Sequence, residues 1–437
     1  MTRGYFLAVI GGVAAAGLTI AVAAAAAPPG DPGHGFYTED QLAAIYRHAP
    51  LGKLPPGPTD GVADNTAAAT LGQFLFFDAD LSGNGKVSCA TCHQPAHAFT
   101  DGRSVAKGIA LGTRHTPTVL NAAFNHWFFW DGRADSLWAQ ALQPLENPRE
   151  AGGDRLHIVH LVAADTALAR AYQQVFGPLP PLADRARFPA HARPDADPHA
   201  PLAVAWQAMA PADRTAVDRV YSNLGKAIEA YERKLVGGPA PFDTYVEGLR
   251  SGDAAKQRAI SDAAKRGLRL FVGTANCDLC HSGPTFSDGQ FHNLGLPLLP
   301  GETPDTGRAD GIRLLRADIF NAAGPFSDDP AGPAKQRLEF LPAPASQLGA
   351  FKTPSLRNVA VTAPYMHDGR FATLRQVLDF YAQGAAASHG RLVGTREATA
   401  NLVPHLTASQ ETDLIAFLQS LTGAPLPPAL TEPPPRP

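Results

Sequence analysis

Two copies of one short motif use every cysteine of this chain. The stretch "CATCH" occupies residues 89–93 and "CDLCH" occupies residues 277–281, so a histidine directly follows each pair of cysteines. Two thiols at this spacing can add to the two vinyl groups of one haem. The adjacent histidine then lies under the iron as its proximal ligand.

Two other uses of four cysteines are disulfide bonds and zinc binding. Both would leave the histidine after each cysteine pair unexplained. The sequence therefore predicts two covalently attached c-type haems. The predicted attachment and iron-binding residues are Cys89, Cys92, His93, Cys277, Cys280 and His281.

The N-terminal residues 1–27 predict a secretory signal peptide. Arg3 precedes an apolar run, and alanines at 25–27 provide small residues for cleavage. The apolar run is also long enough to span a bilayer, so an uncleaved membrane anchor is the alternative. The stretch "PPGDPGHG" follows at once and favours cleavage. We expect an exported, periplasmic protein with no stable membrane span after signal cleavage.

The elements around the motifs predict the fold class. Apolar residues at helical spacing occur just before each motif, at 71–75 and at 268–272, and a glycine-containing turn follows each of them. This internal repeat predicts a mainly α protein with two cytochrome c-like helical domains, each with one haem. The chain of 437 residues has room for two domains, and its net charge of −3 argues against a nucleic-acid partner.

Composition shifts suggest the domain limits. We expect the N-terminal haem domain to span 28–210 and the C-terminal haem domain to span 211–424. A helix with one apolar stripe is predicted within 216–236 and is expected to open the second domain. Proline-rich residues at about 177–205 show no periodicity and predict a surface insertion. Residues 425–437 form a proline-rich tail.

Longer stretches extend the pattern beyond the haem motifs. These are "RHTPTVLNAAF" (114–124), "FWDGRADSLWAQALQPLENPRE" (129–150) and "FKTPSLRNVAVTAPYMHDGRFATL" (351–374). Together with both haem motifs they resemble the bacterial di-haem cytochrome c peroxidase family, which includes the MauG-type enzymes. The resemblance runs in family order from about residue 65 to residue 422.

The resemblance implies that the N-terminal haem binds peroxide. It also implies that Gln140, Pro144 and Glu150 face the open side of this haem. A glutamate in a dry pocket has a raised pKa and can move a proton between the peroxide oxygens. Two alternatives are that Glu150 caps a surface turn and that Glu146 is the acid. The resemblance also implies a distal histidine near Lys107, but none is present there.

Two further positions follow from the same resemblance. Trp130 matches a tryptophan that relays electrons between the haems, and interdomain packing is the alternative. Tyr381 matches the sixth ligand of the second haem, where classical peroxidases use methionine and MauG-type proteins use tyrosine. A buried core tyrosine is the alternative. The predicted helix that carries Tyr381 begins after Thr373, a good N-cap.

A calcium ion between the domains is a further implication of the resemblance. The backbone carbonyl groups of Thr362 and Pro364 would contribute ligands. The family has an asparagine after the arginine of "R-N-x-P", but this chain has His115 after Arg114. Calcium prefers oxygen ligands, so the presence of calcium stays open at this point.

These expectations combine into one hypothesis. We expect an exported peroxidase that reduces hydrogen peroxide at the N-terminal haem. Electrons would come through the C-terminal haem from a small c-type cytochrome or a cupredoxin. The alternative is a MauG-like oxidation of residues in a partner protein. A plain di-haem electron carrier is disfavoured by the missing distal histidine and by the pair Gln140 and Glu150.

Overall fold

The computed structural model describes residues 35–383 and 390–436. The predicted signal peptide lies outside this part of the chain. The protein is mainly helical, which confirms the predicted fold class. The helices are α1 (Glu39–Arg47), α2 (Thr66–Phe77), α3 (Cys89–Cys92), α4 (Leu137–Glu146), α5 (Arg155–Ala164), α6 (Thr166–Phe176), α7 (Pro201–Ala208), α8 (Pro211–Glu232), α9 (Pro241–Ser251), α10 (Asp262–Phe271), α11 (Arg308–Ala317), α12 (Pro333–Glu339), α13 (Leu374–Gln383), α14 (Ala408–Gln419) and α15 (Pro428–Thr431). The strands β1 (Phe291–His292) and β2 (Phe351–Lys352) pair antiparallel.

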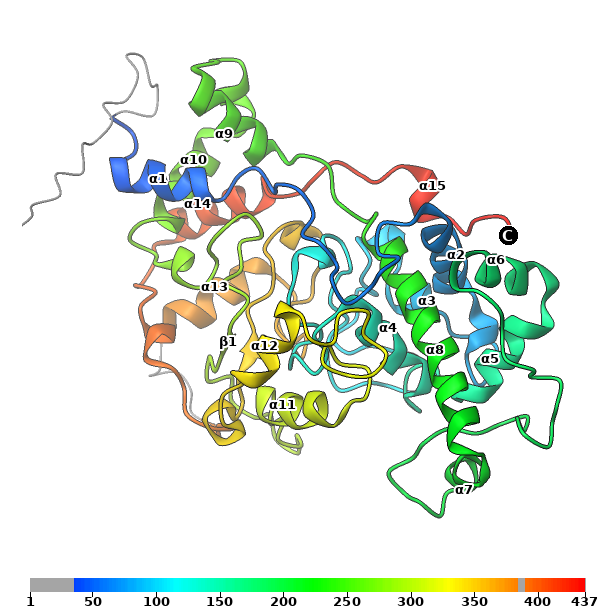
Figure 1. Cartoon of the computed structure of the whole chain (residues 1–437). Helices are drawn as coiled ribbons and strands as arrows, with labels where there is room; N and C mark the ends of the chain where they lie inside the picture. The colour runs from blue at the N-terminus through cyan, green and yellow to red at the C-terminus, as the bar shows by residue number, and fades with distance from the viewer. Residues whose placement is uncertain (1–34, 384–389, 437) are drawn as a thin grey trace, which may run out of the picture.

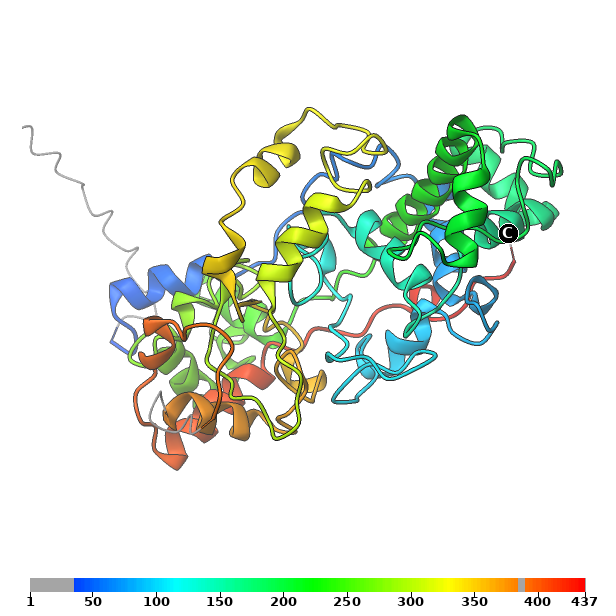
Figure 2. The same ribbon diagram turned by 90° about the horizontal axis from the view of Figure 1, so that it is seen from below.

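The helices form two lobes with separate apolar cores (Figures 1 and 2). The first lobe contains α2 to α8, and the second contains α1, α9, α10, α13 and α14. Each haem motif follows the apolar helix that the sequence predicts, which is α2 in the first lobe and α10 in the second. The fold therefore repeats one arrangement, an apolar helix that leads into a haem motif.

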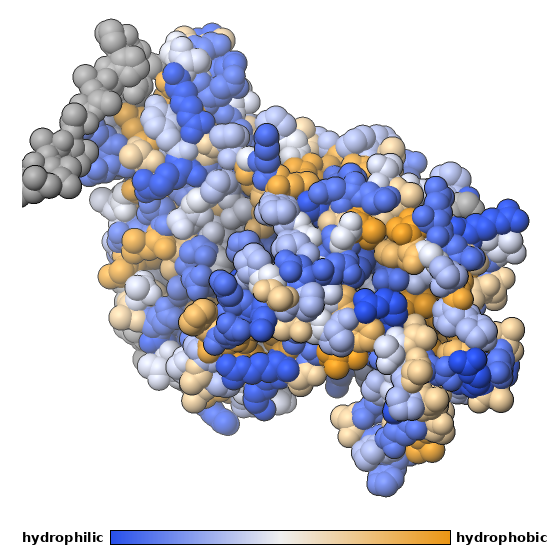
Figure 3. Space-filling view, viewed as in Figure 1, coloured by the Kyte–Doolittle hydropathy of each residue, from blue (hydrophilic) through white to orange (hydrophobic). Residues whose placement is uncertain are grey.

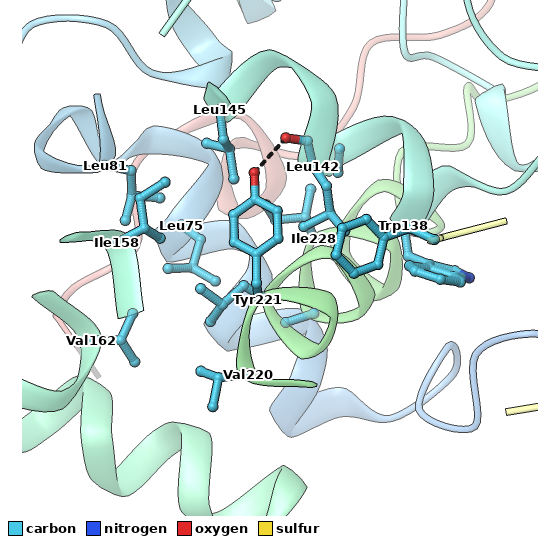
Figure 4. Packing of buried hydrophobic residues seen from close by; sticks show 14 of the residues in the cluster. Leu75, Leu81, Trp138, Leu142, Leu145, Ile158, Val162, Val220, Tyr221 and Ile228 are labelled. Atoms are coloured by element: carbon cyan, nitrogen blue, oxygen red, sulfur yellow. Dashed lines mark hydrogen bonds between the residues drawn. The ribbon is translucent and has the colours of Figure 1, made fainter. Parts of the chain in front are cut away.

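The core of the first lobe is built on α8, which packs closely against α2 and α4. A side chain at Gly72 would collide with the backbone of Ala227, so this glycine lets α2 and α8 approach each other. The hydroxyl of Tyr221 donates a 2.6 Å hydrogen bond to the carbonyl oxygen of Leu142 (Figure 4). The expectation that this helix opens the second domain is wrong. Its apolar stripe is buried in the first core, because periodicity predicts a buried face but not the partner that covers it.

The core of the second lobe is aromatic. Phe271, Phe286 and Phe417 lie within ring contact of one another between α10 and α14. Helix α1 also belongs to this core, through buried residues that include Ile45. The N-terminal segment therefore packs on the second lobe, although the first haem motif follows it in sequence.

The C-terminal tail runs from the second lobe to the first. Leu426 and Leu430 pack against the core of the first lobe, and Figure 2 shows this segment running from one lobe to the other. The hydroxyl of Tyr231 donates a hydrogen bond of 2.6 Å to the carbonyl oxygen of Leu430. Helix α1 and the C-terminal tail thus tie the lobes together.

The predicted insertion at 177–205 also contributes to the core of the first lobe, because Phe188 is fully buried there.

One face of the molecule shows how apolar side chains are distributed on the surface. On the face shown in Figure 3, small apolar patches are separated by hydrophilic side chains. Among residues 35–383 and 390–436, no helix combines the length and the apolar character that crossing a membrane requires.

Candidate active site

One large cavity, with a volume of about 670 Å³, lies between the lobes and reaches both haem motifs. Its walls come from both lobes. The cavity-lining residues that the sequence singled out are Cys92, His93, Trp130, Gln140, Pro144, Glu150, Cys277, Cys280, His281, Thr362, Pro364 and Tyr381. The tertiary structure therefore brings residues from across about 290 positions of sequence around one space.

The two motif histidines have matching environments. The Nδ1 atom of His93 lies 3.2 Å from the carbonyl oxygen of Phe99, and Nδ1 of His281 lies 2.9 Å from that of Phe286. An Nδ1–H that donates to a carbonyl group leaves Nε2 free to bind a metal. Burial lowers the pKa of both histidines, which favours the neutral imidazole that binds iron.

Phe99 and Phe286 were not identified from the sequence. Both are buried, and both have a positive φ, 59° and 54° respectively. The signal for them is present, because a phenylalanine follows the histidine six residues later in the first motif and five residues later in the second. Their backbone conformation turns the carbonyl group toward the histidine.

The residues around the cavity fit two haem groups. The four thiols form no disulfide bond, and the two cysteine pairs do not join in a common metal-binding cluster among the described residues. The structure thus gives no support to disulfide bonds, whereas Cys280 lies with Asp288 and His292 in a group that could hold a metal ion. Positive side chains also line the cavity and can pair with haem propionates. They are Arg114, Arg133, Arg149, Lys352 and Arg370. Burial lowers the pKa of Lys352 to about 8.

The first-lobe wall of the cavity is formed by α4 and the turn after it. Gln140, Pro144 and Asn147 are spaced by four and three residues, so they share one face of the helix. The side-chain amide of Asn147 donates a 2.6 Å hydrogen bond to Oε1 of Glu150. Burial raises the pKa of Glu150, while Arg133 and Asn147 act in the opposite direction. Burial thus favours the protonated form of this carboxyl group, against the effect of Arg133 and Asn147.

A short loop supports Glu150 from its other side. The backbone amide of Ile109 donates a 2.9 Å hydrogen bond to the carbonyl oxygen of Glu150. A Cβ atom at Gly108 would lie 2.5 Å from the same oxygen, so only glycine fits at this position. The sequence analysis missed Gly108. The loop around Lys107, where no histidine occurs, packs on the turn that carries Glu150.

Glu146 has a different partner. Its carboxylate forms a 2.8 Å ion pair with Arg155, which also contacts Asp218 at 2.5 Å. Glu146 is not part of the cavity wall. The geometry therefore favours Glu150 over Glu146 as the acid that faces the cavity.

Trp130 is bonded to both lobes. Its indole N–H donates a 2.9 Å hydrogen bond to the carbonyl oxygen of His115 in the first lobe. Its own carbonyl oxygen accepts a 2.8 Å hydrogen bond from the backbone amide of Lys352 in β2. The neighbouring Trp127 stacks instead with Arg308, whose guanidinium carbon lies 4.4 Å from the ring centroid. Trp138 is fully buried in the first core.

Tyr381 lies on α13, near the second haem motif. The hydroxyl of Thr373 accepts a hydrogen bond from the backbone amide of Gln376, as the predicted N-cap requires. Burial raises the pKa of the Tyr381 phenol, with further contributions from Cys277 and Cys280. Tyr381 is therefore close to both cysteines of the second motif.

A charged side chain outside the cavity lining acts on Tyr381, and a second tyrosine lines the same cavity. Arg396 lowers the pKa of the Tyr381 phenol and has two buried N–H groups without a hydrogen-bond partner. Tyr365 also lines the cavity, but its hydroxyl donates a 3.1 Å hydrogen bond to the carbonyl oxygen of Val359. Neither residue was singled out from the sequence.

A partly exposed cluster of charged side chains flanks the second motif. The ring nitrogens of His292 lie 2.9 Å from Asp288 and 2.7 Å from Glu397. The hydrogen bond with Asp288 is the main cause that raises the pKa of His292 to about 11. Asp288 and Glu397 thus both favour the protonated form of His292.

The residues do not fit the expected calcium site. The ring of His115 lies between two backbone carbonyl groups, with Nδ1 2.8 Å from the oxygen of Arg103 and the ring within hydrogen-bonding reach of Thr362. Calcium takes six to eight oxygen ligands, and an imidazole is not one of them. The nearby carboxamide of Asn121 is also engaged, because its Oδ1 accepts a hydrogen bond from the amide of Gly237.

Comparisons with known proteins identify the family of this chain. The sequence profile of the di-haem cytochrome c peroxidase family matches residues 66–251. The chain is 32% identical to cytochrome-c peroxidase IdrP1 of Denitromonas iodatirespirans, over 85% of this chain and 86% of that protein. It is 33% identical to the methylamine utilization protein MauG of Methylorubrum extorquens, over 81% of this chain and 78% of that protein.

Solved structures show the same fold. A MauG-like protein associated with microbial copper homeostasis superimposes with a TM-score of 0.58 at 27% identity, over 85% of this chain and 94% of that one. The di-haem peroxidase BthA of Burkholderia thailandensis has a TM-score of 0.60 at 24% identity, over 85% of this chain and 91% of that one. By these relatives and by its two haem motifs, the chain is an oxidoreductase that belongs to the di-haem cytochrome c peroxidase family, which includes the MauG proteins.

Proposed function

We propose that this protein is an exported, periplasmic enzyme that reduces hydrogen peroxide at its first haem. Both haems would be bound covalently, through Cys89 and Cys92 and through Cys277 and Cys280. The observation that carries the proposal is the position of Glu150. Its carboxyl group has a raised pKa and lies, with Gln140, on the wall of the cavity that His93 also lines.

The chain's own residues supply proton transfer and orientation. The haem, when bound, provides the iron that binds peroxide and exchanges electrons. Glu150 takes a proton from one peroxide oxygen and returns it to the other, which leaves as water. Two electrons and two further protons complete the conversion of one peroxide molecule into two water molecules. Asn147 holds the carboxyl group in place, and Gln140 orients peroxide by hydrogen bonding.

Electron transfer completes the proposal. His281 and Tyr381 would hold the iron of the second haem, and a small c-type cytochrome or a cupredoxin would supply the electrons. Trp130 couples the haems. This role is supported by its hydrogen bonds to both lobes and by its place on the cavity wall.

A second candidate function is the oxidation of residues in a partner protein by a MauG-like enzyme. The specific observation in its favour is Tyr381, which stands where classical peroxidases of the family have methionine. A tyrosine ligand favours a more oxidised state of its haem than methionine does.

One experiment tests the open first haem and separates the candidates. One equivalent of hydrogen peroxide is added to the diferric holoprotein, and the visible and near-infrared spectra are recorded. We expect a rapid change without prior reduction. No reaction until one haem has been reduced would mean that the first iron has a sixth ligand, and the proposal of an open first haem would then be wrong.

Turnover with reduced cytochrome c as donor is measured in parallel. Fast peroxide reduction supports the peroxidase. A rapid reaction with peroxide combined with negligible turnover supports the oxidation of a partner protein.

A further inference from the structure

His115 occupies the junction between the lobes, where the resemblance implies a calcium ion. The geometry points to an imidazole that takes the place of this metal: we propose that His115 links the lobes directly and that the protein needs no calcium. The proposal concerns the architecture and does not depend on peroxidase activity.

The contacts of His115 reach both lobes. Its Nδ1 lies 2.8 Å from the carbonyl oxygen of Arg103 in the first lobe. The same ring is within hydrogen-bonding reach of the carbonyl oxygen of Thr362 in the second. The backbone amide of His115 donates a 2.8 Å hydrogen bond to the carbonyl oxygen of His367, also in the second lobe. One residue thus joins three separate segments.

The ring of His115 offers calcium no oxygen ligand. His115 is only 5% exposed, and its ring interacts with both carbonyl groups. At least one ring nitrogen carries a proton at every pH, so the ring always donates to one of these oxygens. The carboxylate of Asp101 is nearby, and its Oδ2 is buried without a hydrogen-bond partner. An asparagine at position 115 would add a side-chain oxygen to the carbonyl and carboxylate oxygens around this position. Calcium prefers such oxygen ligands.

Several other interactions at this junction join protein groups directly, without a metal ion. Arg114 forms a bidentate pair with Asp305, at 2.7 and 2.8 Å. The carbonyl oxygen of His115 accepts the indole N–H of Trp130. The imidazole therefore also fixes the backbone that positions Trp130. A direct protein link would keep this arrangement when free calcium is scarce.

The test begins with the holoprotein and requires no variant. Calcium content is measured by elemental analysis, before and after dialysis against EGTA, and thermal unfolding is followed with EGTA or with 1 mM calcium. We expect substoichiometric calcium and the same unfolding midpoint in both conditions. One calcium ion per chain, with a lower midpoint after EGTA treatment, would overturn the proposal.

The variant His115→Asn tests the role of the ring itself. We expect it to bind about one calcium ion per chain and to unfold at a higher temperature with calcium than with EGTA. His97→Asn, which changes an exposed histidine in the first haem loop, is the matched control and should stay insensitive to calcium. A folded His115→Asn protein that neither binds calcium nor loses stability would also overturn the proposal. If this variant fails to fold, the calcium content of the unaltered holoprotein still decides.

Discussion

The side-chain amide of Asn147 donates a 2.6 Å hydrogen bond to the carboxyl group of Glu150. Helix α4 carries Asn147 just beyond its end, and the turn that follows brings Glu150 back toward the cavity. Burial raises the pKa of this carboxyl group, and the amide partly offsets the rise. The hydrogen bond between Asn147 and Glu150 therefore fixes the position of the acid and affects the pH at which it loses its proton.

Replacing Glu150 tests its role as the acid–base group. Glu150→Gln keeps the shape of the side chain but cannot transfer the proton. We expect peroxide turnover to fall about 100-fold or more, the usual contribution of a positioned acid–base group. Glu146→Gln is the matched control, because Glu146 pairs with Arg155 away from the cavity. Equal losses of turnover in both variants would argue against a specific role of Glu150.

Asn147 should set the pH dependence of turnover. Its N–H stabilises the ionised carboxylate, so its removal in Asn147→Ala raises the pKa of Glu150 further. We expect the limb of the pH–rate profile that reports Glu150 to move to higher pH, with both haem spectra unchanged. A limb that stays in place, or moves to lower pH, would assign the titration to another group.

Tyr381 should determine the spectrum of the second haem. Tyr381→Phe removes the phenol oxygen, and we expect the second haem to become five-coordinate in its ferric absorption and electron paramagnetic resonance spectra. Tyr365→Phe is the control, because the Tyr365 hydroxyl lies in the same cavity but is bonded to the backbone of Val359. An unaltered spectrum of the Tyr381→Phe protein would remove Tyr381 as a ligand.

Trp130 should control the rate of electron exchange between the haems. Trp130→Phe replaces the indole with a ring that is harder to oxidise, and it also removes the hydrogen bond to His115. We expect slower exchange, measured by stopped-flow reduction, with little change in peroxide binding. Trp127→Phe, which alters a ring stacked with Arg308, should leave this rate nearly unchanged.

Glu232 should make the protein less stable as the pH rises. It is only 3% exposed, and burial followed by the charge of Glu229 raises its pKa from 4.5 to about 8. Between these values the folded state keeps a proton that the unfolded state has lost. The free energy of unfolding therefore falls with pH by about 1.4 kcal/mol per unit.

The variant Glu232→Gln checks this expectation. The neutral amide has no proton to lose, so the unfolding free energy at pH 7 should rise and its decline between pH 5 and pH 8 should become shallower. Denaturant unfolding of the holoprotein at several pH values measures both effects. An unchanged pH dependence would show that Glu232 is ionised in the folded protein.

Much of the site follows from the sequence alone because its chemistry is local. The spacing of each cysteine pair and the histidine beside it predict haem attachment from only five residues. The family resemblance implied Gln140, Pro144 and Glu150, and the structure places them on one helix and the turn after it. The apolar helices α2 and α10 could be predicted for the same reason, since helical periodicity is a short-range property.

The tertiary structure decided what depends on distant contacts. An apolar stripe requires burial but does not name its partner, so only the fold shows that α8 belongs to the first lobe and α1 to the second. Likewise, only the packing separates Glu150 from Glu146, because their side chains differ in surroundings rather than in type. The link formed by His115 depends on Arg103 and Thr362, which are about 260 positions apart in the sequence. Such a contact has no local signal, and it exists only when the two lobes are together.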